Sequence, residues 1–401
     1  MNHLLNKRSI SIKIPDDEYI KIIFNKKTSK TINKPDFNLD IYKIVNKYKT
    51  FIDKYKDWDK YKCYSNLFEI ITYSSYCKFQ KPLTLYEPIS RAYFKFWEIL
   101  INFNLINPNN SNYKYAALAE GPGGFVECFI NYRKKCFQGK FDKIYCMTLL
   151  NSDTYNVPDW KKISKFLSRK RNNINILYGE DGTGNLYNIE NIKHFIKNTG
   201  KNTMDLVTAD GGFDYSNDFD KQEQLSYRLI FCEIVTALAL TKKGGHFVLK
   251  IFDIFTTLTL KFLYLLNNYY KEVIITKPYI SRPANSEKYI VCKNFIKPLS
   301  DTNLNKYFNI IKNWSDKTYI IDLFTFKVPL WYKKVISMYN YYNSKKQVEN
   351  ILQTLFLINN KISESDKTNI IIKQTVYSLL WCEKYKQNIN FKSNFLKYIK
   401  Y

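Results

Sequence analysis

The sequence predicts an α/β fold in which a mostly parallel β-sheet lies between helices. Between about residues 113 and 292, short apolar stretches that indicate strands alternate with helical patterns, and this alternation is typical of parallel sheets with helical crossovers. The first strand, residues 113–119, leads into a helix at residues 125–132 through the glycine-rich turn 121–124. Such a turn lets a ligand approach the backbone beside the unpaired N–H groups of a helix N-terminus. On its own, however, it would more simply be an ordinary strand-to-helix loop.

The remaining elements follow in chain order. Residues 88–104 have a helical pattern with apolar residues three or four positions apart and with Pro88 in the first turn. Strands are predicted at residues 143–149, 174–178, 204–209, 246–249, 273–276 and 289–292. Helices are predicted at residues 159–169, 191–197, 222–241 and 257–270. In the flanking parts of the chain, helices are predicted at residues 40–59, 347–359 and 367–387, the last with Ser363 or Ser365 as its cap.

The length of the chain favours one α/β core with sizeable additions, because 401 residues exceed the usual size of a single domain. We expect a Lys- and Tyr-rich N-terminal extension at residues 1–85, the α/β core at residues 86–297, and a mostly helical C-terminal region at residues 298–401. The N-terminal extension has no catalytic pattern. We interpret it as a solvated structural extension, with an RNA-contacting or docking surface as the alternative.

The charge of the chain indicates a polyanionic partner. Lys and Arg number 62 against 36 Asp and Glu, which gives a formal charge of +26, and 17% of the residues are aromatic. A basic surface attracts nucleic acid, and aromatic side chains stack on exposed bases. A Lys-, Asn-, Ile- and Tyr-rich composition also follows from an A+T-rich genome, which accounts for part of the charge.

Cysteine and histidine usage argues against several other kinds of site. The eight cysteines form no Cys-x-x-Cys pair and follow no signal peptide, so we expect reduced, mostly buried thiols in a soluble, intracellular protein. No apolar run in the sequence approaches the length of a membrane span. Only three histidines are present, which leaves little material for a histidine triad or a zinc site. We therefore expect no metal, and acid–base chemistry carried mainly by Lys, Asp and Glu.

Ionisable residues stand at the ends of two predicted core strands. Asp210 follows the strand at 204–209, and Lys250 follows the strand at 246–249. The carboxyl ends of parallel strands surround the ligand crevice of a doubly wound sheet. These side chains, and the loop 181–185 after the third strand, are therefore placed to reach a ligand held by the glycine turn. Each is also compatible with a solvated residue at a strand end.

Four separated motifs carry a resemblance to a known family. They are Glu-Gly-Pro-Gly-Gly-Phe at 120–125, Ala-Asp-Gly-Gly-Phe at 209–213, Gly-Gly-His-Phe-Val-Leu-Lys-Ile-Phe-Asp at 244–253 and Ser-Arg-Pro-Ala-Asn-Ser-Glu-Lys-Tyr at 281–289. In order and spacing they resemble the motifs of FtsJ/RrmJ-type S-adenosylmethionine-dependent RNA ribose 2′-O-methyltransferases. The last motif, with Met147-Thr148-Leu149 and the loop 178–193, is most similar to the cap-specific mRNA nucleoside-2′-O-methyltransferases. The resemblance covers about residues 86–297. Homologues of this kind also occur in large DNA viruses, which the residue bias would suit.

The resemblance implies a Rossmann-like methyltransferase fold with a seven-stranded sheet whose last strand is antiparallel, and it assigns roles to individual residues. The implied catalytic Lys-Asp-Lys-Glu tetrad consists of Lys95, Asp210, Lys250 and Glu287. The implied residues for S-adenosylmethionine are Glu120, Gly121, Pro122, Gly123, Gly124, Phe125, Asp181, Asn185, Leu186 and Asp210, with Asn185 and Leu186 near the adenine. The implied RNA contacts are Ser90, Asp220 and Asn285. Asn185 stands where relatives often have an acidic residue, and Ser90 and Asp220 differ in type from the relatives.

The chemistry of a sulfonium methyl donor is intelligible with this tetrad. The methyl group is already activated, so the enzyme must chiefly align it with a ribose hydroxyl and help to remove the hydroxyl proton. Lys250 is the candidate base, or it only steers the hydroxyl while the proton leaves late. Burial and the neighbouring Lys95 would lower the lysine pKa from about 10.4, whereas the carboxylates of Asp210 and Glu287 would raise it. The sequence leaves both outcomes open.

The resemblance implies methylation of the first transcribed nucleotide of capped mRNA. The alternatives are a ribosomal or transfer RNA ribose methyltransferase, and a non-catalytic RNA-binding subunit with the same fold. The intact tetrad and glycine turn argue against the non-catalytic alternative. The expected partners are capped mRNA and other capping or transcription proteins, with no membrane. For a viral protein, the expected location is the host cytoplasm or the virion.

Overall fold

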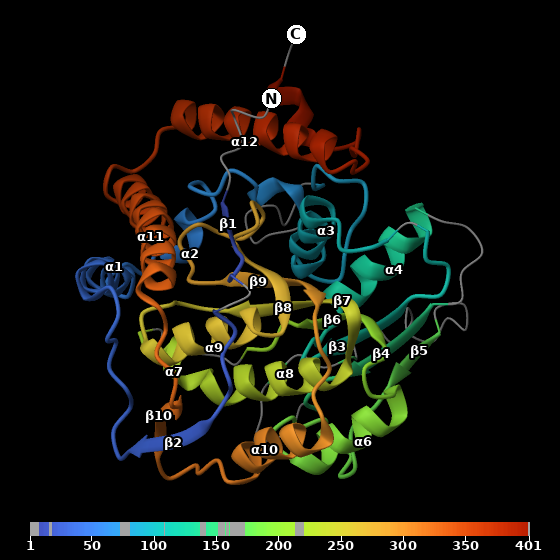
Figure 1. Cartoon of the computed structure of the whole chain (residues 1–401). Helices are drawn as coiled ribbons and strands as arrows, with labels where there is room; N and C mark the ends of the chain where they lie inside the picture. Colours follow the sequence, from blue (N-terminus) through green and yellow to red (C-terminus); the bar gives the residue numbers. More distant parts are fainter. Residues whose placement is uncertain are drawn as a thin grey trace.

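The computed structural model describes residues 8–15, 18–72, 81–107, 109–136, 142–150, 157, 160, 173–212 and 220–399. At its centre is an eight-stranded sheet with the order β1-β8-β9-β7-β6-β3-β4-β5 (Figure 1). The strands are β1 (Ser9–Ile12), β3 (Lys114–Leu118), β4 (Lys143–Met147), β5 (Ile174–Ile176), β6 (Met204–Ala209), β7 (Thr241–Ile251), β8 (Tyr270–Thr276) and β9 (Lys288–Phe295). The helix predicted at residues 159–169 lies, apart from Trp160, outside the described residues.

The strand directions confirm a mostly parallel sheet with an antiparallel last strand. Strands β3 to β7 pair in parallel, and β9 runs antiparallel to both of its neighbours, β7 and β8. All seven strands predicted from the sequence are present. The eighth, β1, comes from the N-terminal extension and pairs antiparallel with β8. It is a four-residue edge strand with the sequence Ser-Ile-Ser-Ile, which is at the lower length limit for a sequence-based strand prediction.

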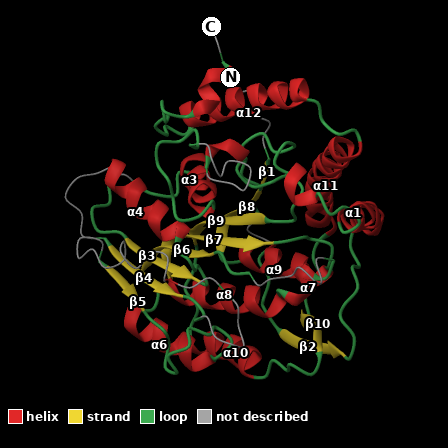
Figure 2. Cartoon of the chain, turned by 180° about the vertical axis from the view of Figure 1, so that it is seen from behind, coloured by secondary structure: helices red, strands yellow, loops and turns green. Residues whose placement is uncertain are grey.

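Helices cover both faces of the sheet (Figure 2). On one face lie α3 (Ala92–Phe103) and α4 (Gly124–Cys136), and on the other lie α6 (Ile189–Thr199), α8 (Tyr227–Leu240), α9 (Thr257–Asn267) and α10 (Asp301–Lys312). Alternate residues of β3 serve the two layers: Tyr115 and Ala117 belong to the core under α3 and α4, while Ala116 and Leu118 belong to the core around α8. A strand that is buried on both faces is nearly continuously apolar. Residues 114–118 and 204–209 follow this pattern except at Lys114, Asp205 and Thr208, which makes them recognisable in the sequence.

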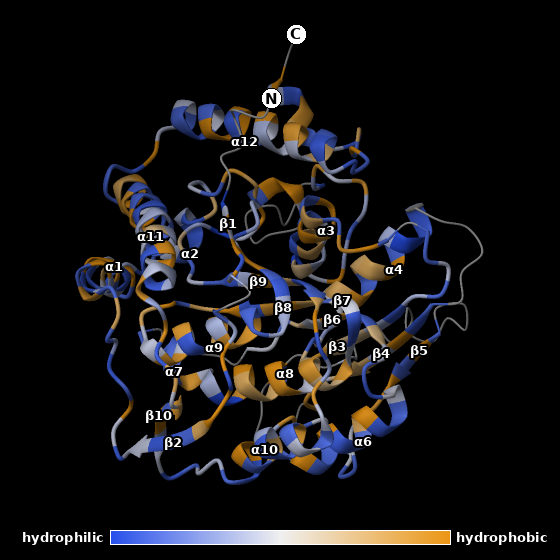
Figure 3. Cartoon of the chain, in the orientation of Figure 1, coloured by the Kyte–Doolittle hydropathy of each residue, from blue (hydrophilic) through white to orange (hydrophobic). Residues whose placement is uncertain are grey.

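The helix predicted at residues 222–241 is divided into two. The short helix α7 (Gln222–Leu225) and the long helix α8 meet at Ser226, whose hydroxyl donates a hydrogen bond to the Glu223 carbonyl (2.9 Å). Within α8 every side chain except Arg228 is buried, and most of the helix is apolar (Figure 3). It therefore fixes one layer of the fold against the sheet.

The N- and C-terminal parts of the chain pack on each other beside the core. Strand β2 (Phe24–Ser29) pairs antiparallel with β10 (Tyr319–Phe324), and α1 (Leu39–Ile52) lies against α11 (Leu330–Asn359). The remaining elements are α2 (Trp58–Tyr61), α12 (Glu364–Lys384) and the 3₁₀ helices η2 (Glu69–Ile71) and η6 (Asn394–Tyr398). The predicted helix 40–59 thus ends at Ile52. The predicted cap of α12 is Ser363, whose Oγ accepts a hydrogen bond from the Asp366 N–H (3.1 Å).

Six cysteines are buried free thiols, as the sequence led us to expect: Cys63, Cys128, Cys146, Cys232, Cys292 and Cys382. The side chains of Cys77 and Cys136 lie outside what the structure describes. In the described part of the chain, none of the helices combines the length and the apolar character that crossing a bilayer requires.

Candidate active site

The glycine-rich turn lies at the carboxyl end of β3 and leads directly into α4. Gly123 has a φ of +104°, a backbone conformation that side chains other than glycine rarely adopt. A Cβ on Gly124 would lie 2.2 Å from Ser90 Oγ, so the segment ahead of α3 packs directly on the turn. Glycine is therefore required at both positions, at one for its conformation and at the other for close packing.

Two residues expected to bind the cofactor, Glu120 and Phe125, support this turn through buried contacts. The Glu120 carboxylate is buried and accepts hydrogen bonds from the N–H groups of Phe125 (2.5 Å) and Val126 (3.3 Å). It thereby caps the N-terminus of α4, and burial raises its pKa. The Phe125 ring is fully buried and stacks on Phe96 with ring centres 4.4 Å apart. Both residues support the turn, and contact of their side chains with the cofactor stays a prediction.

A cavity of about 180 Å³ opens beside the turn, at the carboxyl ends of the parallel strands. Five residues predicted for the site line it: Gly121, Asn185, Leu186, Asp210 and Lys250. The further lining residues include Thr148, Leu149, Tyr187 and Leu229, which were not predicted for the site. Thr148 also holds the turn, because its Oγ1 accepts a hydrogen bond from the Gly121 N–H (3.2 Å). The sheet edge therefore brings the glycine turn, the 178–188 loop and two tetrad residues to one cavity.

Asp181 holds the 178–188 loop together and does not line the cavity. Its carboxylate is exposed and accepts hydrogen bonds from Thr183 N (2.9 Å), Thr183 Oγ1 (2.7 Å), Asn188 Nδ2 (2.7 Å) and Asn191 Nδ2 (2.9 Å). Burial would raise the pKa of Asp181, but these bonds together, those from Thr183 first, outweigh it and lower the pKa to about 2. The ionised carboxylate thus shapes the loop that carries Asn185 to the cavity.

The four tetrad residues come together as two ion pairs. Lys95 Nζ on α3 lies 2.8 Å from Glu287 Oε2, in the loop before β9. Lys250 Nζ near the end of β7 lies 3.3 Å from Asp210 Oδ1 and donates a hydrogen bond to the Asp210 carbonyl (2.6 Å). All four side chains are only 13–14% exposed. Residues far apart in the sequence therefore form one nearly buried charged cluster at the end of the cavity.

The charges of this cluster favour one of the two roles that the sequence left open for Lys250. Burial lowers the pKa of Lys250, but the carboxylates of Asp210, Glu287 and Glu233 outweigh it, and the pKa is raised. Burial would raise the pKa of Glu287, but Lys95 and Lys250 outweigh it and hold the pKa at about 2. At neutral pH Lys250 is thus a cationic hydrogen-bond donor, suited to orienting a hydroxyl group.

The family model of FtsJ-like methyltransferases matches residues 88–295, a region that contains the glycine turn and all four tetrad residues. The chain belongs to the FtsJ-like methyltransferase family. FtsJ-like methyltransferases take the methyl group from S-adenosylmethionine, and the cavity suits such a ligand. It offers the Gly121 backbone, the Asp210 carboxylate and the apolar side chains of Leu149 and Leu186.

Two curated relatives of this FtsJ-like chain are named cap-specific mRNA (nucleoside-2′-O-)-methyltransferase 1. It is 34% identical over 226 residues to the cap-specific mRNA (nucleoside-2′-O-)-methyltransferase 1 of Mus musculus, covering 53% of this chain and 26% of the mouse protein. It is 36% identical over 194 residues to the Homo sapiens protein of the same name, covering 47% of this chain and 22% of the human protein. The chain spans about a quarter of the length of these relatives. A crystal structure of a ribosomal RNA methyltransferase from Plasmodium falciparum aligns with a TM-score of 0.36 and 18% identity, covering 52% of this chain and 98% of that one.

Two side chains that were not predicted for the site fix the tetrad carboxylates of the FtsJ-like core. The Tyr289 hydroxyl donates a hydrogen bond to Asp210 Oδ1 (3.0 Å), and the Ser281 hydroxyl donates one to Glu287 Oε1 (2.9 Å). Each carboxylate is therefore oriented by a lysine and a hydroxyl group. Both hydroxyl residues belong to the fourth motif, so the motif was the signal that could have found them.

A third supporting residue, Lys277, follows β8 and had no sequence signal. Its buried ammonium group donates hydrogen bonds to the Glu287 carbonyl (2.8 Å), the Asn285 carbonyl (2.8 Å) and Asn285 Oδ1 (2.6 Å). Burial, with Lys288 nearby, lowers the pKa of Lys277. Lys277 thus holds the backbone of the loop that presents Glu287.

The residues expected to touch RNA are placed unequally. Ser90 Oγ is buried against Gly124 and has no hydrogen-bond partner among the described residues, so its hydroxyl faces the turn and not solvent. Asp220 is exposed. Asn285 is exposed as well, although its Oδ1 already accepts a hydrogen bond from Lys277. Contact of these residues with RNA stays a prediction, and the placement of Ser90 differs most from the expectation.

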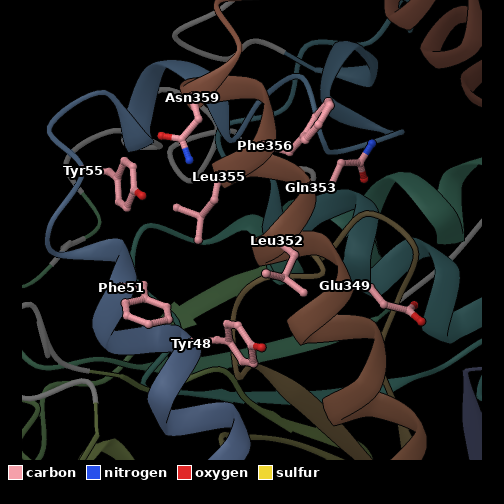
Figure 4. A pocket seen from close by; sticks show the side chains of 9 residues that line it. All are labelled: Tyr48, Phe51, Tyr55, Glu349, Leu352, Gln353, Leu355, Phe356 and Asn359. Carbon is pink, nitrogen blue, oxygen red and sulfur yellow. The ribbon is translucent and has the colours of Figure 1, made fainter.

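A larger cavity of about 740 Å³ lies apart from this chemistry, between α1 and α11 (Figure 4). Tyr48, Phe51 and Tyr55 line one side, and Leu352 and Leu355 of α11 lie opposite. No tetrad or glycine-turn residue lines it. Within the described residues, no group of three or more His, Cys, Asp or Glu side chains is arranged to hold a metal ion. The smaller cavity is therefore the candidate active site.

Proposed function

We propose that this chain transfers a methyl group from S-adenosylmethionine to a ribose 2′-hydroxyl of RNA. The supporting observation is that Asp210 and Lys250 line the same cavity as the glycine turn while Lys95 and Glu287 complete the charged cluster. A binding module would not need four nearly buried ionisable residues at one end of a cofactor cavity.

The cavity residues suggest how the cofactor is held. The turn at Gly121 and Gly123 would receive the methionine end, and Asn185 with Leu186 would lie against the adenine. The bound group supplies a methyl that is already activated on a sulfonium. The chain itself then has to exclude water, place the hydroxyl in line with that methyl, and stabilise charge as the proton leaves.

The tetrad suggests a division of these tasks. Lys250, as an ammonium group fixed by the Asp210 carbonyl, would donate a hydrogen bond to the ribose oxygen and stabilise the negative charge that develops on it. Glu287, held by Lys95 and Ser281, would keep the ammonium groups in place. The oxygen–methyl bond would form as the sulfur–methyl bond breaks, and the hydroxyl proton would leave late, to solvent, since Lys250 already carries its own proton.

The names of the relatives suggest the substrate. We infer that the methylated nucleotide is the first transcribed nucleotide of capped mRNA, and that other capping or transcription proteins are partners. We also infer a large DNA virus as the source, from the Lys-, Asn-, Ile- and Tyr-rich composition, with the host cytoplasm or the virion as the location. The neighbouring genome sequence tests the source.

The function is tested by incubating the full chain with labelled S-adenosylmethionine and matched capped and uncapped RNAs, and then mapping the methylated nucleotide. We expect label on the 2′-oxygen of the first transcribed nucleotide of the capped RNA only. Equal labelling of both RNAs would contradict the cap-specific substrate. No labelling of either RNA, by a preparation that binds the cofactor, would contradict the methyl-transfer function.

A further inference from the structure

A cleft of about 270 Å³ lies between α11, α12 and the N-terminal segment, and we name it the Arg8 cleft. Its lining includes three basic side chains, Arg8, Lys346 and Lys373, together with Pro283 from the loop that carries Glu287. Apart from Pro283, these residues lie outside the matched family region 88–295. The cleft is therefore built by the additions to the FtsJ-like core, where they meet its catalytic loop.

Arg8 is the strongest sign that the cleft takes an anionic ligand. Its Nε and Nη1 atoms are buried, and within the described residues neither has a hydrogen-bond partner. The guanidinium packs over the Tyr279 ring, 5.1 Å from its centre, which fixes its position without satisfying these donors. Buried donors without acceptors are costly, and the planar fork of arginine matches the oxygen atoms of a phosphate.

The remaining charges leave the cleft with a surplus of positive charge. Lys346 belongs to α11 and Lys373 to α12, the two helices that flank the cleft. One carboxylate, Glu349, also lines it, but Glu349 is exposed and lies 4.0 Å from Lys345 on its own helix. Three cations therefore line the cleft with one carboxylate that already has a basic neighbour, while the buried Glu98 carboxylate attracts Arg8 from outside the lining. An anion is the ligand that this arrangement favours.

Backbone contacts join the cleft to the catalytic loop. The Arg8 carbonyl accepts a hydrogen bond from the Lys277 N–H (3.1 Å), and the same lysine holds the Glu287 carbonyl through its side chain. On α11, Gln347 Nε2 donates a hydrogen bond to the Ala284 carbonyl (2.8 Å). The loop 281–287 thus contributes Pro283 to the cleft and the Glu287 carboxylate to the tetrad.

We propose that the Arg8 cleft binds a backbone phosphate of the RNA substrate, outside the nucleotide that is methylated. This inference rests on the proposed function, because it takes RNA to be the substrate. An RNA chain with one ribose at the tetrad passes the loop 281–287 and brings another part of its backbone to the cleft. Phosphate contacts position a nucleic acid and add affinity. The cleft therefore acts on RNA binding and leaves the chemical step alone.

The test compares two double variants of the full chain that remove the same charge. Lys346→Ala/Lys373→Ala removes one half-buried and one exposed cation from the cleft, and the control Lys334→Ala/Lys392→Ala removes two exposed lysines outside it. Binding of a 5′-labelled capped RNA is followed by fluorescence anisotropy at several salt concentrations. We expect the cleft variant to bind roughly tenfold more weakly and with a salt slope smaller by about 1 to 2, and the control by less than about twofold. Equal losses in both variants would overturn the proposal.

Two further measurements identify the ligand of the cleft. Arg8→Lys keeps the charge and removes the fork, so we expect weaker RNA binding with an unchanged melting temperature. Inorganic phosphate should compete with RNA only weakly. If phosphate strongly stabilises the wild type but not the cleft variant, and both bind RNA with equal affinity, the cleft binds a free anion and the proposal is overturned. Because binding is measured without turnover, RNA binding through the cleft with no methyl transfer would support the cleft while contradicting the proposed function.

Discussion

Two charged clusters lie at the start of β9, and they differ in their access to the cavity beside the glycine turn. The tetrad is one. The other is the Asp253 cluster, which consists of Lys49, Asp253, Ser286 and Lys288. Lys49 Nζ lies 2.7 Å from Asp253 Oδ2, and Lys288 Nζ lies 3.2 Å from Asp253 Oδ1. The Ser286 hydroxyl donates a hydrogen bond to Asp253 Oδ2 (3.0 Å). The paired side chains of the two clusters are similarly buried, with Asp253 13% and Lys49 14% exposed.

Burial and pairing therefore do not distinguish a reaction centre from a structural cluster, whereas access does. Asp210 and Lys250 line the cavity beside the glycine turn. Asp253 does not line this cavity; both of its carboxylate oxygens, like those of Glu287, are held by donors from the protein itself. One of these donors, Lys49, comes from α1, outside the matched family region. We therefore propose that the tetrad serves the reaction and that the Asp253 cluster fastens the N-terminal extension to the core.

The largest effect expected in this comparison is on the Lys95–Glu287 pair. Lys95→Ala and Glu287→Gln should each lower the rate constant of methyl transfer about 10³-fold, because each disturbs the placement of Lys250. The double variant should lose little more, since the residues act as a unit. Single-turnover kinetics checks this, with cofactor affinity as the control. Multiplying losses would mean that the two residues act independently.

The second effect is on cofactor binding. Gly123→Val forces a side chain into a backbone with a φ of +104°, in the turn beside the proposed cofactor site, and should weaken S-adenosylmethionine binding at least 100-fold by calorimetry. Gly244→Val is the matched control, because Gly244 also has a positive φ, +79°, and nothing lies within 4 Å of an added Cβ. It should cost stability and keep cofactor affinity. Equal affinity in both variants would place the cofactor elsewhere.

The third effect is on stability. Asp253→Asn should lower the free energy of unfolding in urea by roughly 3 kcal/mol, because it leaves two buried lysines without their carboxylate. Methyl transfer by the folded variant should remain within about threefold of the wild type. A large loss of transfer with unchanged stability would reverse the roles assigned to the two clusters.

The smallest effect is on the pH dependence of stability. Burial would raise the pKa of Asp253, but Lys49 and Lys288 outweigh it and hold the pKa well below its usual value of about 3.9. A carboxylate whose pKa is depressed by folding stabilises the protein above its unfolded pKa, and this contribution is lost as the pH falls through the folded pKa. The stability difference between wild type and Asp253→Asn should therefore be constant above about pH 5 and narrow below it. A difference that is independent of pH down to pH 3 would show that the cluster is not ionised as described.

The two clusters also show what the sequence can reveal. The tetrad was predictable because Asp210 and Lys250 stand at the ends of strands whose continuous apolar character marks them, and because Glu287 lies in a recognisable motif. The Asp253 cluster was not predicted, because Lys49 meets Asp253 across 204 residues and a surface-type helix gives no sign of what it packs against. The raised pKa of Lys250 depends on the balance of burial against three carboxylates, which only the packed structure sets.

The same distinction applies to the fold. The strands of the parallel core were predicted because burial on both faces makes them continuously apolar. Strand β1 was not predicted; it has four residues, two of them serines, and lies in the N-terminal extension outside the alternating core. Lys277 escaped because its hydrogen bonds go mainly to backbone carbonyls, which leave no pattern in the side chains of their residues.

The most direct test of the account is a single-turnover measurement of methyl transfer with both substrates saturating, on Lys250→Ala and Asp253→Asn side by side. Each variant removes one charge from one cluster. We expect Lys250→Ala to lose at least 10³-fold in rate while it still binds S-adenosylmethionine and RNA, because the lost interaction matters mainly in the transition state. We expect Asp253→Asn to remain within about threefold of the wild type. Substantial transfer by Lys250→Ala would contradict the assignment of the reaction to the tetrad.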